Sequence, residues 1–206
     1  MARCYSGAMA RLKPLPRRWP KVWPKVWPKV WIVSDARNAA ALVHALKSLP
    51  RGSGLIYRHY HLPEAERRAH FAVLKRIARA RGHWIAWSGS VAAARRLGAD
   101  AAYGSGQVLG SGGTLPRLVT VHSLREMARA HRADAMLLSP VFATRSHPGA
   151  RPLGPLRFRL IAARSAVPVI ALGGLNAKAA QRLKWPMWAA IDAFCAKATR
   201  PKSADS

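Results

Sequence analysis

The sequence predicts an α/β fold, a compact (β/α)8 TIM barrel, and three observations lead to this prediction. Short apolar runs alternate with amphipathic segments along residues 30–196, a pattern typical of parallel strands joined by helical crossovers. Eight such runs occur, which is the number of strands that closes a TIM barrel. The chain of 206 residues is long enough for one domain with a sizeable core. The alternative on the same pattern is an open, doubly wound sheet.

The apolar runs are the expected strands, and each is read from a short cluster of β-branched, aromatic or small apolar residues. They lie at 30–35, 54–60, 83–89, 100–105, 117–123, 135–142, 167–174 and 187–194. The helical segments between them lie at 38–49, 63–82, 90–99, 124–133, 155–166 and 176–184.

The helix at 63–82 has the clearest start and stop signals. Pro63 lies near its beginning, Glu64 and Glu66 fall in its first turn, and Gly82 ends it. By contrast, residues 106–116 are rich in glycine, so we expect the fourth helix to be missing or collapsed. We also expect the eighth helix to be reduced to a few residues.

Residues 1–29 are predicted to be a disordered basic extension. Residues 19–31 read WPKVWPKVWPKVW, three copies of Trp-Pro-Lys-Val closed by Trp31. Proline at every fourth position excludes helix and favours an extended, polyproline-like chain. The repeat is either a platform on which single-stranded nucleic acid stacks or a tandem duplication tolerated near a chain end. Residues 197–206 are predicted to be a disordered tail.

The excess of basic residues indicates which kinds of binding partner the protein has. There are 35 Lys and Arg against 8 Asp and Glu, a formal net charge of +27. Such a balance suits an anionic partner such as a phosphate ester, or it reflects a general bias towards arginine on solvated helix faces. Nucleic acid is the weaker expectation because the tryptophans concentrate in the repeat. Two cysteines, the absence of a signal-like apolar segment and the absence of a run of about 20 apolar residues predict a cytoplasmic protein without membrane contact.

Because active sites of TIM barrels lie at the carboxyl ends of the strands, the residues there are the candidates. Gly173 and Gly174 end the seventh strand, where backbone N–H groups at a helix start can hold phosphate. Thr144 and Ser146, after the sixth strand, can donate hydrogen bonds, and the loop also carries Arg145. The other candidates at strand ends are His147, Asp35, Arg58, His59, Ser139, Asp192 and His122, the last as a general acid or base.

The segments SPVFATRSHPG (139–149) and VPVIALGGLN (167–176) resemble thiamine phosphate synthase and the related thiazole tautomerases, which are compact (β/α)8 barrels. The resemblance covers residues 30–194 and is most specific over 119–176. It implies that hydroxymethylpyrimidine pyrophosphate is coupled to thiazole phosphate with release of pyrophosphate, a transferase reaction of thiamine biosynthesis. Both substrates are small phosphorylated molecules.

The resemblance assigns roles residue by residue. It implies that Gly173, Gly174, Thr144, Ser146 and His147 bind the thiazole phosphate. It implies that Arg58 and His122 act in catalysis.

The resemblance breaks down at the metal. The synthases hold Mg²⁺ with an Asp after the third strand and another after the fourth, whereas this chain has Ser88 and Gly89 at the first place and GQVLG (106–110) at the second. We therefore predict no metal held by the protein, with Mg²⁺ entering only with the substrate pyrophosphate. Asp192 stands where the family has a Ser, and its carboxylate would repel an anion.

Two alternatives follow from that departure. A tautomerase-like isomerase needs no metal and would use His122 to move a proton on thiazole carboxylate phosphate. A catalytically inactive barrel would keep only the phosphate site.

Overall fold

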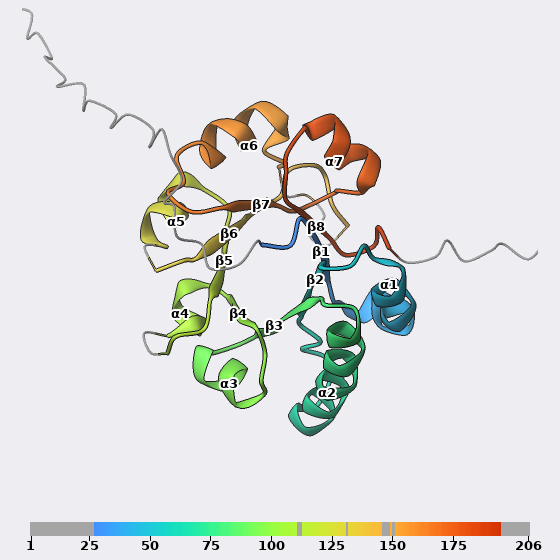
Figure 1. Cartoon of the computed structure of the whole chain (residues 1–206). Coiled ribbons are helices and arrows are strands. Elements are labelled where there is room, and N and C mark those ends of the chain that lie inside the picture. Colours follow the sequence, from blue (N-terminus) through green and yellow to red (C-terminus); the bar gives the residue numbers. More distant parts are fainter. Residues whose placement is uncertain (1–26, 111–112, 131, 146–148, 150, 195–206) are drawn as a thin grey trace, which may run out of the picture.

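The computed structural model describes residues 27–110, 113–130, 132–145, 149 and 151–194, and these residues form a closed barrel of eight parallel strands. The strands follow one another around the barrel in chain order, and the last pairs with the first through Val30 and Trp188. Figure 1 looks along the barrel, with the helices arranged around the ring of strands. The predicted (β/α)8 fold is confirmed, and the open doubly wound sheet is excluded.

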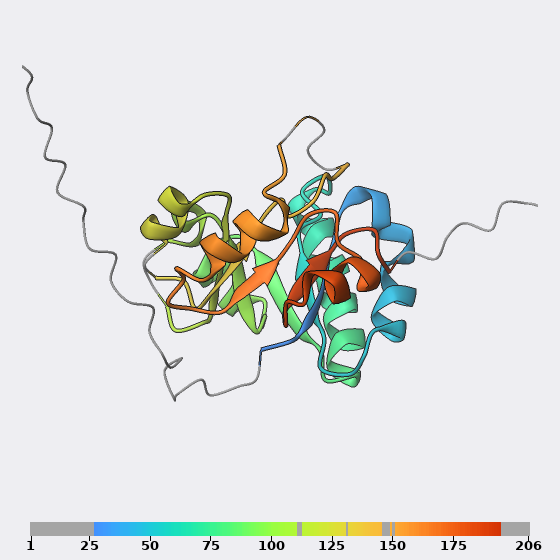
Figure 2. The same ribbon diagram turned by 90° about the horizontal axis from the view of Figure 1, so that it is seen from above.

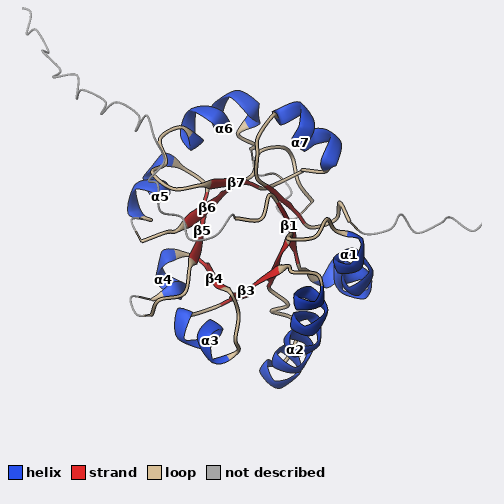
Figure 3. Ribbon diagram, viewed as in Figure 1, coloured by secondary structure: helices blue, strands red, loops and turns tan. Residues whose placement is uncertain are grey.

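The strands are short, three to five residues each, and helices connect them (Figure 3). The strands are β1 (Val30–Val33), β2 (Gly54–Tyr57), β3 (Trp84–Ser88), β4 (Ala101–Gly104), β5 (Arg117–Val121), β6 (Ala135–Leu138), β7 (Val169–Ala171) and β8 (Trp188–Ala190). The helices are the 3-10 helix η1 (Ala36–Ala41), then α1 (Leu42–Ser48), α2 (Glu64–Ala80), α3 (Val91–Arg96), α4 (Gly106–Leu109), α5 (Leu124–Arg129), α6 (Gly154–Ala162) and α7 (Ala177–Leu183).

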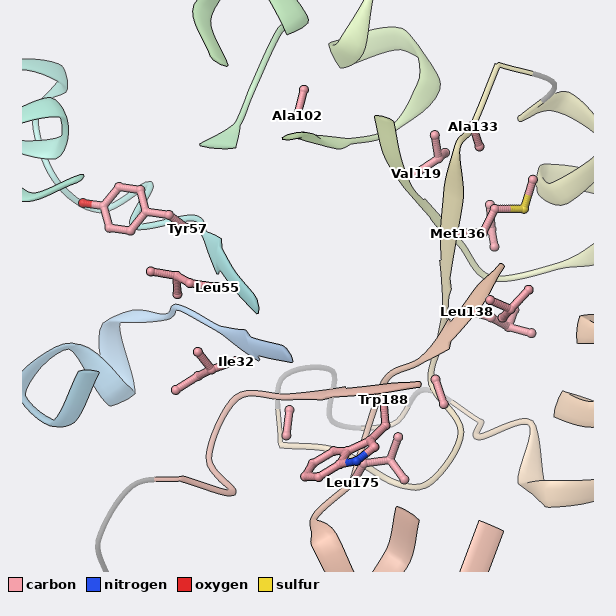
Figure 4. Packing of buried hydrophobic residues seen from close by; sticks show 14 of the residues in the cluster. Ile32, Leu55, Tyr57, Ala102, Val119, Ala133, Met136, Leu138, Leu175 and Trp188 are labelled. Carbon is pink, nitrogen blue, oxygen red and sulfur yellow. The ribbon is translucent and has the colours of Figure 1, made fainter. Parts of the chain in front are cut away.

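The core has two layers because side chains alternate along each strand. One layer fills the barrel interior and includes Trp31, Val33 and Ile56, all fully buried. The other lies between strands and helices, where Ile32 and Leu55 point towards the surrounding helices (Figure 4). Both faces of every strand are thus apolar, and the polar residues are left to the strand ends and loops.

The expected strands that extend into polar residues are shorter in the structure. The run at 54–60 stops at Tyr57, and the next three residues belong to the loop that leads to α2. The segment expected to lack a fourth helix holds a single helical turn, α4, which Ser105 caps through its side chain. After β8, residues 191–194 form a turn, and 195–206 lie outside the described residues.

The boundary predicted at residue 30 is wrong by three residues. Trp27 is buried at the amino-terminal end of the barrel, where its ring lies 5.1 Å from the ring of Trp84. The carbonyl of Pro28 accepts a hydrogen bond from Trp31 Nε1 at 2.8 Å, and the carbonyl of Lys29 accepts one from the backbone of Trp188. The last copy of the repeat is therefore part of the fold. Residues 1–26 lie outside the described residues.

No helix in the described part of the chain is both long and apolar enough to span a membrane. The parallel strands place all their carboxyl ends at one end of the barrel, and the described residues between β6 and α6 extend beyond the body of the barrel (Figure 2). The candidate residues are found at this end.

Candidate functional site at the carboxyl end of the barrel

A chain of ion pairs links four strand ends around the barrel mouth. Arg145, after β6, donates to Asp192, after β8, with Nη2 and Oδ2 3.2 Å apart. Asp192 lies 3.6 Å from Arg37, which donates to Asp35 at 2.8 Å. Asp35 lies 4.0 Å from Arg58, after β2. The structure thus joins three candidate residues, Asp35, Arg58 and Asp192, through Arg37, and Arg145 extends the chain beyond Asp192.

Asp35 is held by local structure as well as by charge. Its side chain accepts the backbone N–H of Arg37, and Asn38 completes a capping box by accepting the backbone N–H of Asp35. Partial burial would raise the pKa of Asp35, but the hydrogen bonds and charge of Arg37, together with the charge of Arg58, lower it overall. Asp35 is therefore a fixed carboxylate that orients Arg37 and lies at the longer distance of 4.0 Å from Arg58.

The predicted phosphate residues line one pocket of about 290 Å³ between the ends of β6, β7 and β8. Thr144, Arg145, Gly173, Gly174 and Asp192 all contribute to its wall. Ser146 and His147, which are predicted for the same site, lie outside the described residues. The pocket thus unites three of the five predicted phosphate-binding residues with Arg145 of the same loop and with the carboxylate of Asp192.

Packing within the fold requires glycine at positions 173 and 174, whether or not a ligand binds there. Gly173 and Gly174 have φ of +101° and +62°. A Cβ on Gly173 would lie 2.7 Å from Pro140 Cα, and one on Gly174 would overlap the carbonyl oxygen of Ala143. The glycines therefore let the β6 loop pack directly onto the β7 turn, and this close approach brings Thr144 and Arg145 to the pocket.

His122 lies at the end of β5 and contacts the predicted rim residue Ser139. Its Nδ1 is 2.9 Å from the Ser139 carbonyl oxygen and 3.2 Å from the Ser139 hydroxyl. A carbonyl can only accept a hydrogen bond, so Nδ1 carries the proton in the neutral ring and Nε2 is left as a proton acceptor. His122 is exposed and does not line the pocket beside Gly173.

Arg67 of α2 is a buried cation that the sequence reasoning missed. Its Nε donates to the carbonyl of Arg58 at 2.9 Å, and its Nη2 donates to the carbonyl of Ser88 at 2.6 Å. The guanidinium also lies 3.8 Å from the ring centre of Trp87. Arg67 thereby ties the end of β2 to the end of β3. It occupies a buried stripe of the helix with Phe71, Leu74 and Ala78, and that spacing was the available signal.

His59 follows Arg58 beyond the end of β2, but its side chain is buried below the rim and is not exposed on it. Its side chain is 1% exposed, and its ring stacks on that of His70 with the two Nδ1 atoms 3.1 Å apart. Burial lowers the pKa of His59 to about 4, and the nearby His70 and His61 act in the same direction. A neutral, buried imidazole packed against a helix has a structural role.

The ends of β3 and β4 do not fit a magnesium ion. Mg²⁺ in proteins takes carboxylate oxygens, yet the carbonyl of Ser88 already accepts from the Arg67 guanidinium, and its hydroxyl is hydrogen-bonded to Tyr60. Gly89 offers no side chain. Within the described residues no group of three or more His, Cys, Asp or Glu could hold a metal ion.

A larger hollow of about 430 Å³ lies away from this site, between α4 and α5. It exists because α4 is a single turn and leaves this side of the barrel partly uncovered. Its lining includes Leu109, Val119 and Ala133, which belong to the layer between strands and helices. The hollow therefore belongs to the outside of the barrel and not to its mouth.

Comparisons with known proteins point to one family. Residues 118–192 match the family described as "Thiamine monophosphate synthase". A protein of Aquifex aeolicus named "Putative thiamine-phosphate synthase 2" is 40% identical over 59 residues. That match covers 28% of this chain and spans about a third (32%) of the relative's length.

Solved structures show the same fold. A thiamine phosphate pyrophosphorylase from Pyrococcus furiosus superposes with a TM-score of 0.65 at 22% identity, covering 80% of this chain and 85% of the other. A second, from Bacteroides thetaiotaomicron, gives 0.55 at 15% identity, covering 79% and 82%. FabK from Thermotoga maritima gives 0.60 at 14% identity, covering 82% and 59%. At these identities the superpositions establish the barrel alone, and the likeness to the family rests on the two sequence matches.

Proposed function

We propose that the chain is a divergent member of the thiamine phosphate synthase and TenI-like family and a synthase-type transferase, because residues 118–192 match the family and a short segment is 40% identical to a relative named for this activity. In the proposed reaction the bond between the pyrimidine methyl carbon and the pyrophosphate oxygen breaks. The thiazole nitrogen then bonds to that carbon, and pyrophosphate leaves. The observation that carries the proposal is the pocket in which Thr144 and Arg145 face the turn of Gly173 and Gly174.

The pocket suits the phosphate of the thiazole substrate. Arg145 and the Thr144 hydroxyl can donate to phosphate oxygens, and hydrogen bonds from a charged donor to an anion are about twice as strong as neutral ones. The backbone N–H groups of a glycine turn are a further source of donors. The site is small, about 290 Å³, which suits one phosphate group and not a large ligand.

Arg58 is the proposed partner of the leaving pyrophosphate. It stands after β2 with its carbonyl fixed by Arg67 and its guanidinium 4.0 Å from Asp35. A contact of that length is weak, so the guanidinium is free to turn to a ligand. Charge neutralisation by a preorganised cation is often the dominant contribution to such catalysis. Any Mg²⁺ would enter with the pyrophosphate, since the strand ends do not fit a resident ion.

The test is the coupling reaction with the full chain. Hydroxymethylpyrimidine pyrophosphate and thiazole phosphate are supplied with and without Mg²⁺, and thiamine phosphate and pyrophosphate are measured by chromatography. We expect equal amounts of both products, and a loss of about 10²-fold or more in Arg58→Ala. Arg68→Ala, an exposed arginine of α2, is the matched control and should keep full activity. A folded wild-type protein that forms neither product would rule the transferase out.

The geometry of His122 favours a second candidate, the tautomerase-like isomerase. Its Nε2 is an unprotonated acceptor in the neutral ring because Nδ1 donates to Ser139. Such a group can take a proton from a thiazole carboxylate phosphate and return it elsewhere. Incubation with that compound, followed by NMR, tests the isomerase directly. Binding of thiazole phosphate without either reaction would indicate the inactive barrel.

A further inference from the structure

The backbone of Arg58, the proposed partner of the pyrophosphate, is held by two side chains from other elements. Arg58 is the first residue beyond the end of β2. Its N–H donates to the hydroxyl of Ser34, which follows β1, at 2.7 Å. Its carbonyl accepts from Nε of Arg67 on α2 at 2.9 Å. Ser34 and Arg67 therefore set the point from which the Arg58 side chain starts.

The guanidinium of Arg67 is itself fixed on the barrel. While Nε binds the carbonyl of Arg58, Nη2 donates to the carbonyl of Ser88 at the end of β3, at 2.6 Å. The Arg67 side chain is 11% exposed, and its guanidinium lies 3.8 Å from the ring centre of Trp87. Its ion pair with Glu64 is longer, 3.5 Å, and that carboxylate is half exposed, so the pair contributes little.

Tyr60 stands beside both arginines in the same loop. Its ring centre lies 5.8 Å from the guanidinium carbon of Arg58 and 5.2 Å from that of Arg67, within the range of cation–π attraction. Its hydroxyl is hydrogen-bonded to the hydroxyl of Ser88. Arg67 therefore contacts both the backbone of Arg58 and the ring that limits where the Arg58 guanidinium can turn.

The bridge from β2 to β3 suits a guanidinium better than an ammonium. Nε and Nη2 of Arg67 donate from one rigid plane, and this plane reaches two carbonyls at once. A lysine at position 67 would keep the charge but would offer a single donor atom on a flexible stem. Arg67→Lys therefore separates the geometry of the bridge from its charge.

We propose that Arg67 is a positioning residue for the leaving pyrophosphate, because it holds the loop after β2 on the end of β3 and so presents Arg58 to the ligand. The inference rests on the proposed function, in which Arg58 meets the pyrophosphate, and adds the residue that orients this contact. Arg67 acts through Arg58, since its own Nε and Nη2 already bind carbonyls. A misplacement of about 1 Å can cost about 10²-fold in a reaction of this kind.

The test is the affinity for inorganic pyrophosphate, titrated into the full chain by calorimetry at one fixed Mg²⁺ concentration. Arg67→Lys should bind pyrophosphate about tenfold more weakly than wild type. In the Arg58→Ala background, the same substitution should change the affinity by less than about twofold, because residues that act as a unit are not additive. A residue that only stabilised the fold would weaken binding equally in both backgrounds.

A second variant and two controls accompany this cycle. Arg67→Met keeps an apolar stem against Trp87 but has no donor, and it should show the same pattern as Arg67→Lys. Arg68→Lys and Arg68→Met make the same substitutions at the next position, whose side chain is 57% exposed and also pairs with Glu64. Both controls should leave the affinity nearly unchanged, because exposed charges are screened. Urea unfolding checks that each variant is folded.

Each outcome decides the positioning role. Wild-type affinity in both Arg67 variants would overturn it and leave the proposed function standing, and so would an equal loss in the Arg58→Ala background. Failure of both Arg67 variants to fold would show a structural role instead. Pyrophosphate binding with the expected pattern, but no thiamine phosphate formed by wild type, would keep the positioning role and rule out the transferase. A wild type that binds no pyrophosphate would overturn the roles of Arg67 and Arg58 together.

Discussion

At the scale of single residues, His122 separates the two enzyme candidates. Coupling rests on charge neutralisation and positioning, so His122→Ala should cost at most about tenfold in thiamine phosphate formation. Isomerisation needs the proton acceptor, and general acid–base catalysis contributes about 10²–10⁴-fold. The same variant should therefore lose about 10²-fold or more in thiazole isomerisation, measured by NMR.

His122→Asn is the companion variant because it keeps a hydrogen-bonding group that cannot titrate. For an isomerase it should be as impaired as His122→Ala. Full isomerase activity in both variants would show that another group moves the proton.

Strand ends were the part of the site that the sequence could predict. Arg58, Asp35, Thr144 and Asp192 follow apolar runs, and in a parallel barrel every such end faces the same mouth. Arg67 was missed because it reaches the rim from a helix, and only the buried stripe of α2 reveals it. The ion pair between Arg145 and Asp192 joins residues 47 positions apart, a contact that no local pattern encodes.

At the scale of elements, a side chain at position 174 should disrupt the packing of the loop after β6 on the turn after β7. Gly174→Ala would place a Cβ into the carbonyl of Ala143 and would hold an alanine at φ +62°. We expect a loss of about 3 kcal/mol of unfolding free energy and loss of phosphate binding. Urea unfolding and ligand titration measure the two effects.

Gly52→Ala is the matched control for Gly174. It has a similar φ of +76°, but nothing lies within 4 Å of its Cβ position. Only the backbone strain should remain, about 1 kcal/mol. Equal losses in the two variants would mean that the packing of the loop on the turn contributes nothing.

The buried histidines between α2 and the loop after β2, His59 and His70, should make the free energy of unfolding fall at acid pH. The pKa of His59 is about 4 in the folded protein, against about 6.5 in an unfolded chain. Between these values the unfolded chain binds more protons, so stability is complete above pH 6.5 and falls as the pH drops towards 4. The pKa of His70 is also lowered, which acts in the same direction. The loss assigned to His59 is about 2 kcal/mol.

Urea unfolding at pH 7.5 and 4.5 checks this dependence. Asparagine tolerates the φ of +26° at position 59 and does not titrate. His59→Asn should therefore lose less stability between the two pH values than the wild type does. An identical loss in both proteins would assign the acid sensitivity to other groups.

The order of strands and helices could be predicted because apolar residues repeat about every two positions in strands and about every 3.6 positions in helices. The residues at which the elements end could not be predicted in this way. The run at 54–60 has the pattern of one strand, but the strand ends at Tyr57 and residues 58–60 belong to the following loop. The carbonyl of Arg58 accepts a hydrogen bond from Arg67 of α2 and not from a neighbouring strand. The glycine-rich segment 106–116 predicted a fourth helix that is missing or collapsed. It could not reveal the single turn that Ser105 caps.

At the scale of the whole molecule, one copy of the Trp-Pro-Lys-Val repeat helps to close the amino-terminal end of the barrel. Trp27 is 9% exposed and packs with the interior layer beside Trp84. From the sequence, Trp27 looks like its neighbours in the repeat, so composition alone placed it in the extension. The position of Trp27 is fixed by the next tryptophan, since Trp31 fills the barrel at Gly54 and donates to the carbonyl of Pro28.

Trp27→Ala should therefore destabilise the barrel as a core substitution does, by about 3 kcal/mol in urea unfolding. Lys29→Ala, at an exposed position of the same copy, should change the unfolding free energy by no more than about 0.5 kcal/mol. Trp27→Phe should recover part of the loss, because a smaller ring still covers the interior layer. If Trp27→Ala were as stable as Lys29→Ala, the barrel end would close without the repeat, and the first strand would begin the fold on its own.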